Sequence, residues 1–97
     1  MLAARPAPPR ALVASPVTAG IHVLFEPSRS NVDEYQVDAV PLSPRSNKTA
    51  RTLLGSFERE TTLRDLVPGE LYNVSVLAWM NSVPSHPVYS TARIGNI

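Results

Sequence analysis

The stretch LRDLVPGELYNVSVLAWM, Leu63 to Met80, decides the fold of this chain. From Tyr72 to Ala78 every second residue is apolar, whereas the residues between them include Asn73 and Ser75. A period of two places the apolar set on one side of an extended strand and leaves the other side free to meet solvent. The stretch therefore predicts a half-buried strand, and it is the strongest strand signal in the sequence.

A tyrosine follows a turn signal at the start of this strand. The pair Pro68-Gly69 is typical of a turn, because glycine can take the positive φ that such turns often require. A tyrosine placed just after such a turn can bury its ring at the edge of a core while its hydroxyl bonds the backbone of the preceding loop. The spacing of Leu66, Pro68, Gly69 and Tyr72 predicts a tyrosine corner of this kind.

The rest of the chain also shows strand periodicity. Residues 21–26 and 35–40 alternate in the same way, and segments 60–66 and 88–94 are β-prone, while the polar stretch 42–58 predicts a loop followed by a short edge strand. Short strands separated by turns, without helical crossovers, predict an all-β antiparallel sandwich or small barrel. The inward-facing set is predicted to be Ile21, Val23, Phe25, Tyr35, Val37, Leu63, Leu66, Tyr72, Val74, Val76 and Ala78.

Composition narrows the classes of function. The 97 residues correspond to one domain, with a formal net charge of +1 and no cysteine. Nearly balanced charge disfavours nucleic acid as a partner, and no segment is long and apolar enough to insert into a membrane. The absence of cysteine excludes disulfides, thiolate metal sites and cysteine nucleophiles.

Several motifs together resemble the fibronectin type III family. They are the IHVLFEP strand at 21–27, the YQV strand at 35–37, the corner and strand TLRDLVPGELYNVSVLA at 62–78, and SHP at 85–87. The resemblance implies an immunoglobulin-like β-sandwich of seven strands, three against four. The departure is Phe25, where the family most often has tryptophan, so the aromatic core residue is smaller here. The stretch 66–76 also looks somewhat like repeats in the ectodomains of receptor-type tyrosine phosphatases.

This resemblance sets the expected role and domain limits. Residues 1–10 are rich in proline and alanine and are expected to be a linker or flexible terminus, with the domain at 11–97. Family members act as spacers and protein-interaction modules in multidomain cell-surface and extracellular proteins, and we expect that role and that location. An intracellular cytoskeletal or sarcomeric array is the alternative. Expected partners are other proteins or neighbouring domains.

Two Asn-x-Ser/Thr sequons are candidate N-glycosylation sites. They begin at Asn47, in the polar loop, and at Asn73, on the outward side of its strand. Short sequons also arise by chance. Use of either one would distinguish a secreted module from an intracellular one.

The outward side of the Tyr72 strand carries the candidate interaction residues. Tryptophan is enriched at interaction hot spots, although Trp79 can equally lean on its cross-strand neighbours or on an adjacent domain. The loop after it lacks Arg-Gly-Asp. The candidate surface consists of Leu77, Trp79, Met80 and Val83.

Catalysis and cofactor binding are not expected. The two histidines, His22 and His86, lack the spacing of any metal or catalytic motif, so no metal, cofactor or catalytic residue is predicted. Arg45, Lys48 and Arg51 are too dispersed for a strong field, and a glycan ligand is not expected. Because proline removes a ladder donor at a sheet edge, we expect a monomer.

Overall fold

The computed structural model describes residues 4–43 and 48–95, and it is built from strands. No described helix is long and apolar enough to cross a bilayer. In chain order the strands are β1 (Arg10–Val17), β2 (Gly20–Glu26), β3 (Glu34–Pro41), β4 (Ala50–Gly55), β5 (Glu60–Leu63), β6 (Leu71–Met80), β7 (Val83–Pro84) and β8 (Val88–Arg93).

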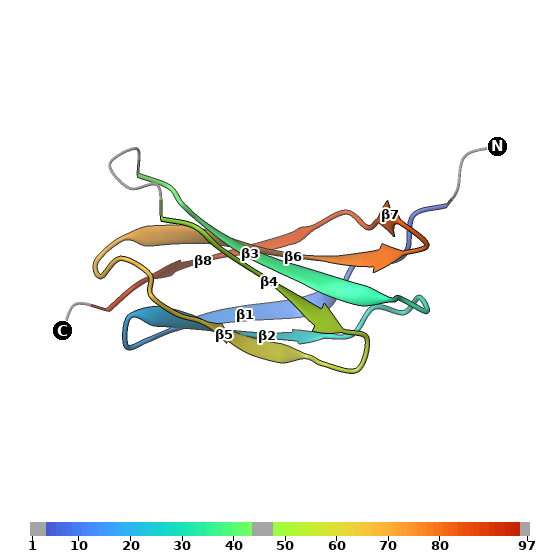
Figure 1. The fold of residues 1–97 in the computed structure, drawn as a ribbon, viewed down its shortest axis with the longest axis horizontal. Coiled ribbons are helices and arrows are strands. Elements are labelled where there is room, and N and C mark those ends of the chain that lie inside the picture. Colours follow the sequence, from blue (N-terminus) through green and yellow to red (C-terminus); the bar gives the residue numbers. More distant parts are fainter. Residues whose placement is uncertain (1–3, 44–47, 96–97) are drawn as a thin grey trace.

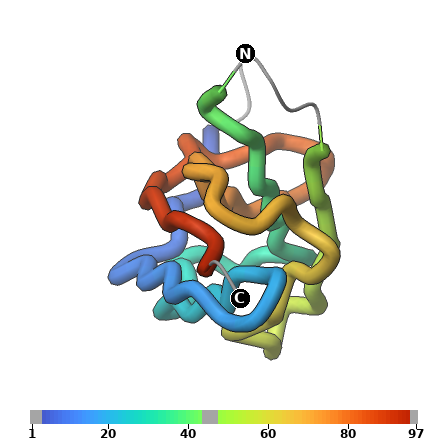
Figure 2. The backbone as a smooth tube through the Cα atoms, turned by 90° about the vertical axis from the view of Figure 1, so that its left-hand side faces the viewer, coloured from blue at the N-terminus to red at the C-terminus, as the bar shows by residue number. Residues whose placement is uncertain are grey.

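The strands form two antiparallel sheets that pack face to face (Figure 1). One sheet has the order β1-β2-β5, and the other has the order β4-β3-β6-β7 with β8 also paired to β6. Figure 2, viewed along the long axis, places β1 and β8 at one side of the sandwich and β4 and β5 at the other. This confirms the predicted all-β sandwich, and the short edge strand expected after the polar loop is β4.

The structure has eight strands where seven were expected, because the last strand is interrupted and forms β7 and β8, which both pair with β6. Ser85 is buried between β7 and β8; its backbone N–H donates to the Ala78 carbonyl at 2.7 Å, and its Oγ accepts the Ala78 N–H at 2.9 Å. One serine therefore satisfies both backbone groups of Ala78 where the regular ladder breaks. The sequence predicted a loop at this place, whereas the structure has the two-residue strand β7.

The core lies between the sheets and contains the whole predicted inward set. Alternation along each strand produces it, because residues two apart share a face. Phe25 is 1% exposed, and its ring centroid lies 4.9 Å from that of Tyr35 at an interplanar angle of 60°. The core cluster also contains four residues that were not in the predicted set: Ala39, Leu54, Ala92 and Ile94.

The tyrosine corner is present. The Tyr72 side chain is fully buried, and its hydroxyl accepts the Val67 N–H at 3.2 Å and donates to the Lys48 carbonyl at 3.0 Å. Leu66 is buried beside it, and Gly69 has φ of 82°, the left-handed conformation that the turn requires. The hydroxyl thus joins two loops, the one before β6 and the one before β4.

The described part of the N-terminal segment packs more closely than the expectation of a linker over residues 1–10. Pro6 and Pro9 are buried, and Arg10 is already the first residue of β1. The Ala7 N–H donates to Ser30 Oγ at 2.7 Å, and Ser28 Oγ donates to the Ala7 carbonyl at 2.6 Å. Proline has no N–H to leave unsatisfied, so this segment can pack without a ladder partner. The packed unit begins before residue 11.

Candidate interaction surface

The outer face of the five-stranded sheet carries the best-developed group of side chains outside the core. Here "outer face" means the side of this sheet turned away from the three-stranded sheet. Strand alternation places polar residues and a few large apolar ones on it. The outer face comprises Gln36, Asp38 and Val40 of β3, Arg51 and Leu53 of β4, Asn73, Ser75, Leu77 and Trp79 of β6, and Tyr89 of β8.

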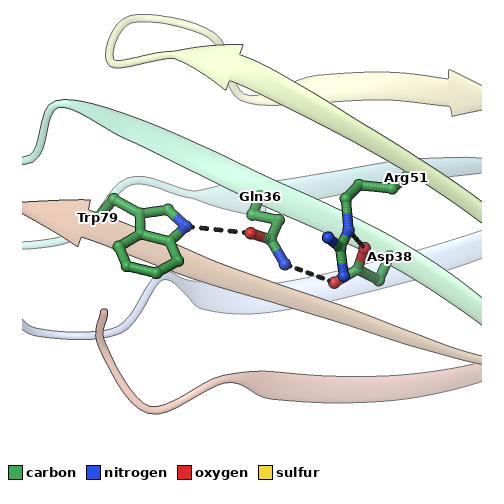
Figure 3. Close-up of polar contacts among 4 residues, drawn as sticks. All are labelled: Gln36, Asp38, Arg51 and Trp79. Carbon is green, nitrogen blue, oxygen red and sulfur yellow. Dashed lines mark hydrogen bonds and ion pairs between the residues drawn. The ribbon is translucent and has the colours of Figure 1, made fainter. Parts of the chain in front are cut away.

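A chain of polar contacts crosses the outer face from β6 to β4 (Figure 3). Trp79 Nε1 donates to Gln36 Oε1 at 3.1 Å, and Gln36 Nε2 donates to Asp38 Oδ2 at 2.8 Å. Arg51 Nε lies 2.6 Å from the other carboxylate oxygen, Asp38 Oδ1. Each group in the chain meets a complementary partner, so these four side chains are held in defined orientations on rigid strands.

Two hollows lie on the outer face, one on either side of this polar chain. The Trp79 hollow, of about 400 Å³, is lined by Asp33, Glu34, Gln36, Leu53, Trp79 and Ser82. The Tyr89 hollow, of about 670 Å³, is lined by Asp38, Val40, Leu42, Thr49, Ala50, Arg51, Asn73, Ser75 and Tyr89. The outer face therefore offers two separate places where another group can seat.

Three exposed apolar side chains line these hollows, and a fourth lies in a turn. Leu53 is 56% exposed, Leu42 is 54% exposed and Tyr89 is 63% exposed. Phe57, in the turn between β4 and β5, is 97% exposed. The sequence reasoning did not select these four residues, because Leu42, Leu53 and Phe57 lie in a polar stretch with weak periodicity and Tyr89 in a short final strand.

The family model for the fibronectin type III domain matches residues 7–91. This chain belongs to the fibronectin type III family. The match begins before the predicted domain start at residue 11, in agreement with the packing of Pro9. Domains of this family are modules of multidomain proteins and are generally non-catalytic binding units. No curated protein matches the chain.

Solved fibronectin type III domains share the fold. A domain of the human collagen alpha-1(XX) chain is 21% identical with a TM-score of 0.83, covering 100% of this chain and 92% of that one. The FN5 domain of Drosophila Lar is 19% identical with a TM-score of 0.78, at coverages of 95% and 99%. A two-domain segment of chicken tenascin is 28% identical with a TM-score of 0.77; it covers 88% of this chain, which spans 48% of that segment.

The four predicted interaction residues of this fibronectin type III domain are all half-buried. Leu77 and Trp79 lie on the outer face, where Gln36 of β3, which is paired with Leu77, accepts the hydrogen bond of the Trp79 indole. Met80 and Val83 pair across the hairpin between β6 and β7, whose two turn residues both have positive φ. Trp79 thus joins the outer face, while Met80 and Val83 belong to the hairpin at its end.

The other predicted site residues are placed as follows. Asn73 lines the Tyr89 hollow, whereas Asn47 and Arg45 lie outside the described residues. Arg51 is paired with Asp38, and the Lys48 carbonyl accepts a hydrogen bond from the Tyr72 hydroxyl.

Within residues 4–43 and 48–95, no group of three or more His, Cys, Asp or Glu side chains is arranged to hold a metal ion. On the three-stranded sheet, His22 Nε2 of β2 lies 3.9 Å from Glu60 Oε1 of the adjacent strand β5. His86 is exposed.

Proposed function

We propose that this fibronectin type III domain is a non-catalytic spacer and protein-interaction module of a multidomain cell-surface or extracellular protein. The observation that carries the interaction role is the outer face of the five-stranded sheet. It presents a tryptophan and an arginine, two residue types enriched at hot spots, next to the exposed Leu53. A rigid polar chain holds them, so a partner meets a surface that is already ordered.

The shape of the domain supports the spacer role. It measures 49 × 25 × 17 Å along its principal axes. The first described residues lie at the β7 end, where Arg5 donates a hydrogen bond to the Pro84 carbonyl. The last described residues lie at the tyrosine-corner end, where the Ile94 carbonyl accepts the Gly69 N–H (Figure 1). A module whose two ends lie at opposite ends of its long axis extends a string of domains. The tenascin segment, which has two such domains, supports this arrangement.

Binding to intact cells tests the interaction role. A fluorescent tetramer of the domain is expected to bind the surface of cultured cells or their deposited matrix. Leu53→Asp puts a charge into the Trp79 hollow and is expected to reduce this binding at least tenfold. The matched control is Leu24→Asp, which charges an exposed leucine on the outer side of the three-stranded sheet. Equal losses in both variants, or no binding by the parent domain, would contradict the proposal.

The extracellular location is supported by the position of Asn73 on an accessible face. Peptide mapping of the native parent chain before and after enzymatic removal of N-glycans tests it. Conversion of Asn73 or Asn47 to aspartate on glycan release is the expected result. Unmodified asparagines at both positions would favour the alternative, a module of an intracellular cytoskeletal or sarcomeric array.

A further inference from the structure

The Asn73-Val74-Ser75 sequon and the Tyr89 hollow coincide. Asn73 and Ser75 are two residues apart on β6, so both side chains face outward, and both line the hollow. Asn73 lies between Val40 of β3 and Thr91 of β8, and Ser75 lies opposite Tyr89. The side chain to which a sugar would be attached therefore lines the hollow from a strand and is not on a projecting loop.

The Asn73 side chain is available for modification. Its amide has no hydrogen-bond partner among the described residues, and the side chain is half-exposed. Most of the other polar groups on this face are occupied, since Asp38 bonds both Gln36 and Arg51. Glycosylation at Asn73 would thus disrupt no existing contact in the described structure.

The lining of the hollow matches a neutral sugar. A pyranose ring has apolar C–H faces and a polar rim, and the hollow offers the exposed apolar side chains of Val40, Leu42 and Tyr89. Thr49 and Ser75 supply hydroxyl groups beside them. The two charges in the lining, Asp38 and Arg51, neutralise each other at 2.6 Å, which favours an uncharged occupant over an ionic one. Its volume of about 670 Å³ is of the size that small-molecule sites have, about 300 to 1,000 Å³.

We propose that Asn73 carries an N-linked glycan whose first N-acetylglucosamine residues pack into the Tyr89 hollow, against Tyr89, Val40 and Leu42. This rests on the secretory placement in the proposed function, because the donor is a lipid-linked oligosaccharide. The bond between Asn73 Nδ2 and sugar C1 forms as the bond from C1 to the lipid diphosphate breaks; Nδ2 loses one proton and the lipid diphosphate leaves. Covalent attachment holds the sugar at high effective concentration over the hollow.

A consequence is a division of the outer face. The glycan attached to Asn73 occupies the Tyr89 hollow, and the Trp79 hollow on the other side of the polar chain remains open to a partner. The glycan also covers exposed apolar surface of Tyr89, Val40 and Leu42.

To test this inference, the chain is fused to a cleavable secretion signal and secreted from cultured animal cells. The test therefore does not depend on where the native protein is located. Mass mapping is expected to show a glycan at Asn73. Thermal unfolding is then compared among the intact glycoprotein, a form trimmed enzymatically to one N-acetylglucosamine, and Asn73→Asp, which matches the product of complete glycan removal. We expect the trimmed and intact forms to unfold about 2 to 6 °C above Asn73→Asp.

Two exposed-residue variants identify the contact. Tyr89→Ala is expected to abolish the difference between glycosylated and unglycosylated forms, whereas Leu53→Ala, in the Trp79 hollow, is expected to keep it. Nuclear Overhauser effects between the sugar and the Tyr89 ring provide an independent readout. An unmodified Asn73, or a stabilisation that survives Tyr89→Ala, would overturn the inference. Unmodified asparagine in the native chain alone would instead contradict the extracellular placement.

Discussion

A buried tyrosine lies at each end of the ladder between β3 and β6, and the two ends differ in how they are fastened. Tyr72 lies opposite Pro41, and its hydroxyl joins two loops through a donated and an accepted hydrogen bond. Tyr35 lies opposite Ala78, and its hydroxyl accepts one bond, from the Ser28 N–H at 2.9 Å. The Tyr72 end is therefore held by hydrogen bonds. The Tyr35 end depends more on the packing of its ring against Phe25.

The largest expected effect is at the Tyr35 end. Phe25→Ala removes the ring that packs against Tyr35 and leaves a cavity between the sheets, so we expect a loss of about 3 to 5 kcal/mol in the free energy of unfolding. Urea titration followed by tryptophan fluorescence measures it. A loss below about 1 kcal/mol would show that packing is not what holds this end.

The next effect is at the tyrosine corner. Tyr72→Phe keeps the ring but leaves the Val67 N–H and the Lys48 carbonyl without the hydroxyl, and we expect it to cost about 1 to 3 kcal/mol. Tyr89→Phe is the control, because that side chain is 63% exposed. An unchanged urea midpoint in Tyr72→Phe would remove the distinction between the two ends.

A smaller effect is expected for the same substitution at the other tyrosine. Tyr35→Phe removes one hydrogen bond, to the part-buried Ser28 N–H, and we expect a cost of about 0.5 to 1.5 kcal/mol. Measured beside Tyr72→Phe under the same conditions, it ranks the two hydroxyls directly. If Tyr35→Phe proved the more costly of the two, the ends would be fastened in the opposite way.

The smallest effect on stability is expected at Phe57, which is at neither the Tyr35 end nor the Tyr72 end. Phe57 is 97% exposed in the turn between β4 and β5, whereas Phe25 is 1% exposed. We expect Phe57→Ala to change the free energy of unfolding by no more than about 0.5 kcal/mol. Comparing Phe25→Ala with Phe57→Ala separates the effect of losing a buried ring from the effect of losing any phenylalanine. A large loss of unfolding free energy in Phe57→Ala would mean that the Phe57 side chain makes a contact that the structure does not show.

The difference between the two tyrosines also marks what can be predicted from sequence. Tyr72 follows Leu66, Pro68 and Gly69 at a spacing that specifies a corner, so both its burial and the role of its hydroxyl were predicted. Tyr35 was predicted to face the core from its alternation alone. The partner of its hydroxyl, Ser28, lies in a turn whose course no local pattern specifies.

The candidate interaction surface was predicted less completely than the core. Alternation along β6 correctly placed Leu77, Trp79 and Asn73 on the outward side. It could not show that Arg51 meets Asp38 or that Tyr89 lies beside Ser75, because these contacts depend on which strands are neighbours and on their register. Met80 and Val83 were grouped with Trp79 by closeness in sequence, and the tight hairpin takes them to the end of the sheet instead.

The sequence by itself determined the strands, the inward-facing residues, the tyrosine corner and the family, because these follow from the two-residue period and from turn residues that act locally. Only the tertiary structure decided the packing of Pro6 and Pro9, the exposure of Phe57 and the meeting of the Asn73 sequon with Tyr89. The packing of the two prolines and the meeting of the sequon with Tyr89 bring together segments far apart in the chain. The second of these contacts comes from the order of the strands in the five-stranded sheet.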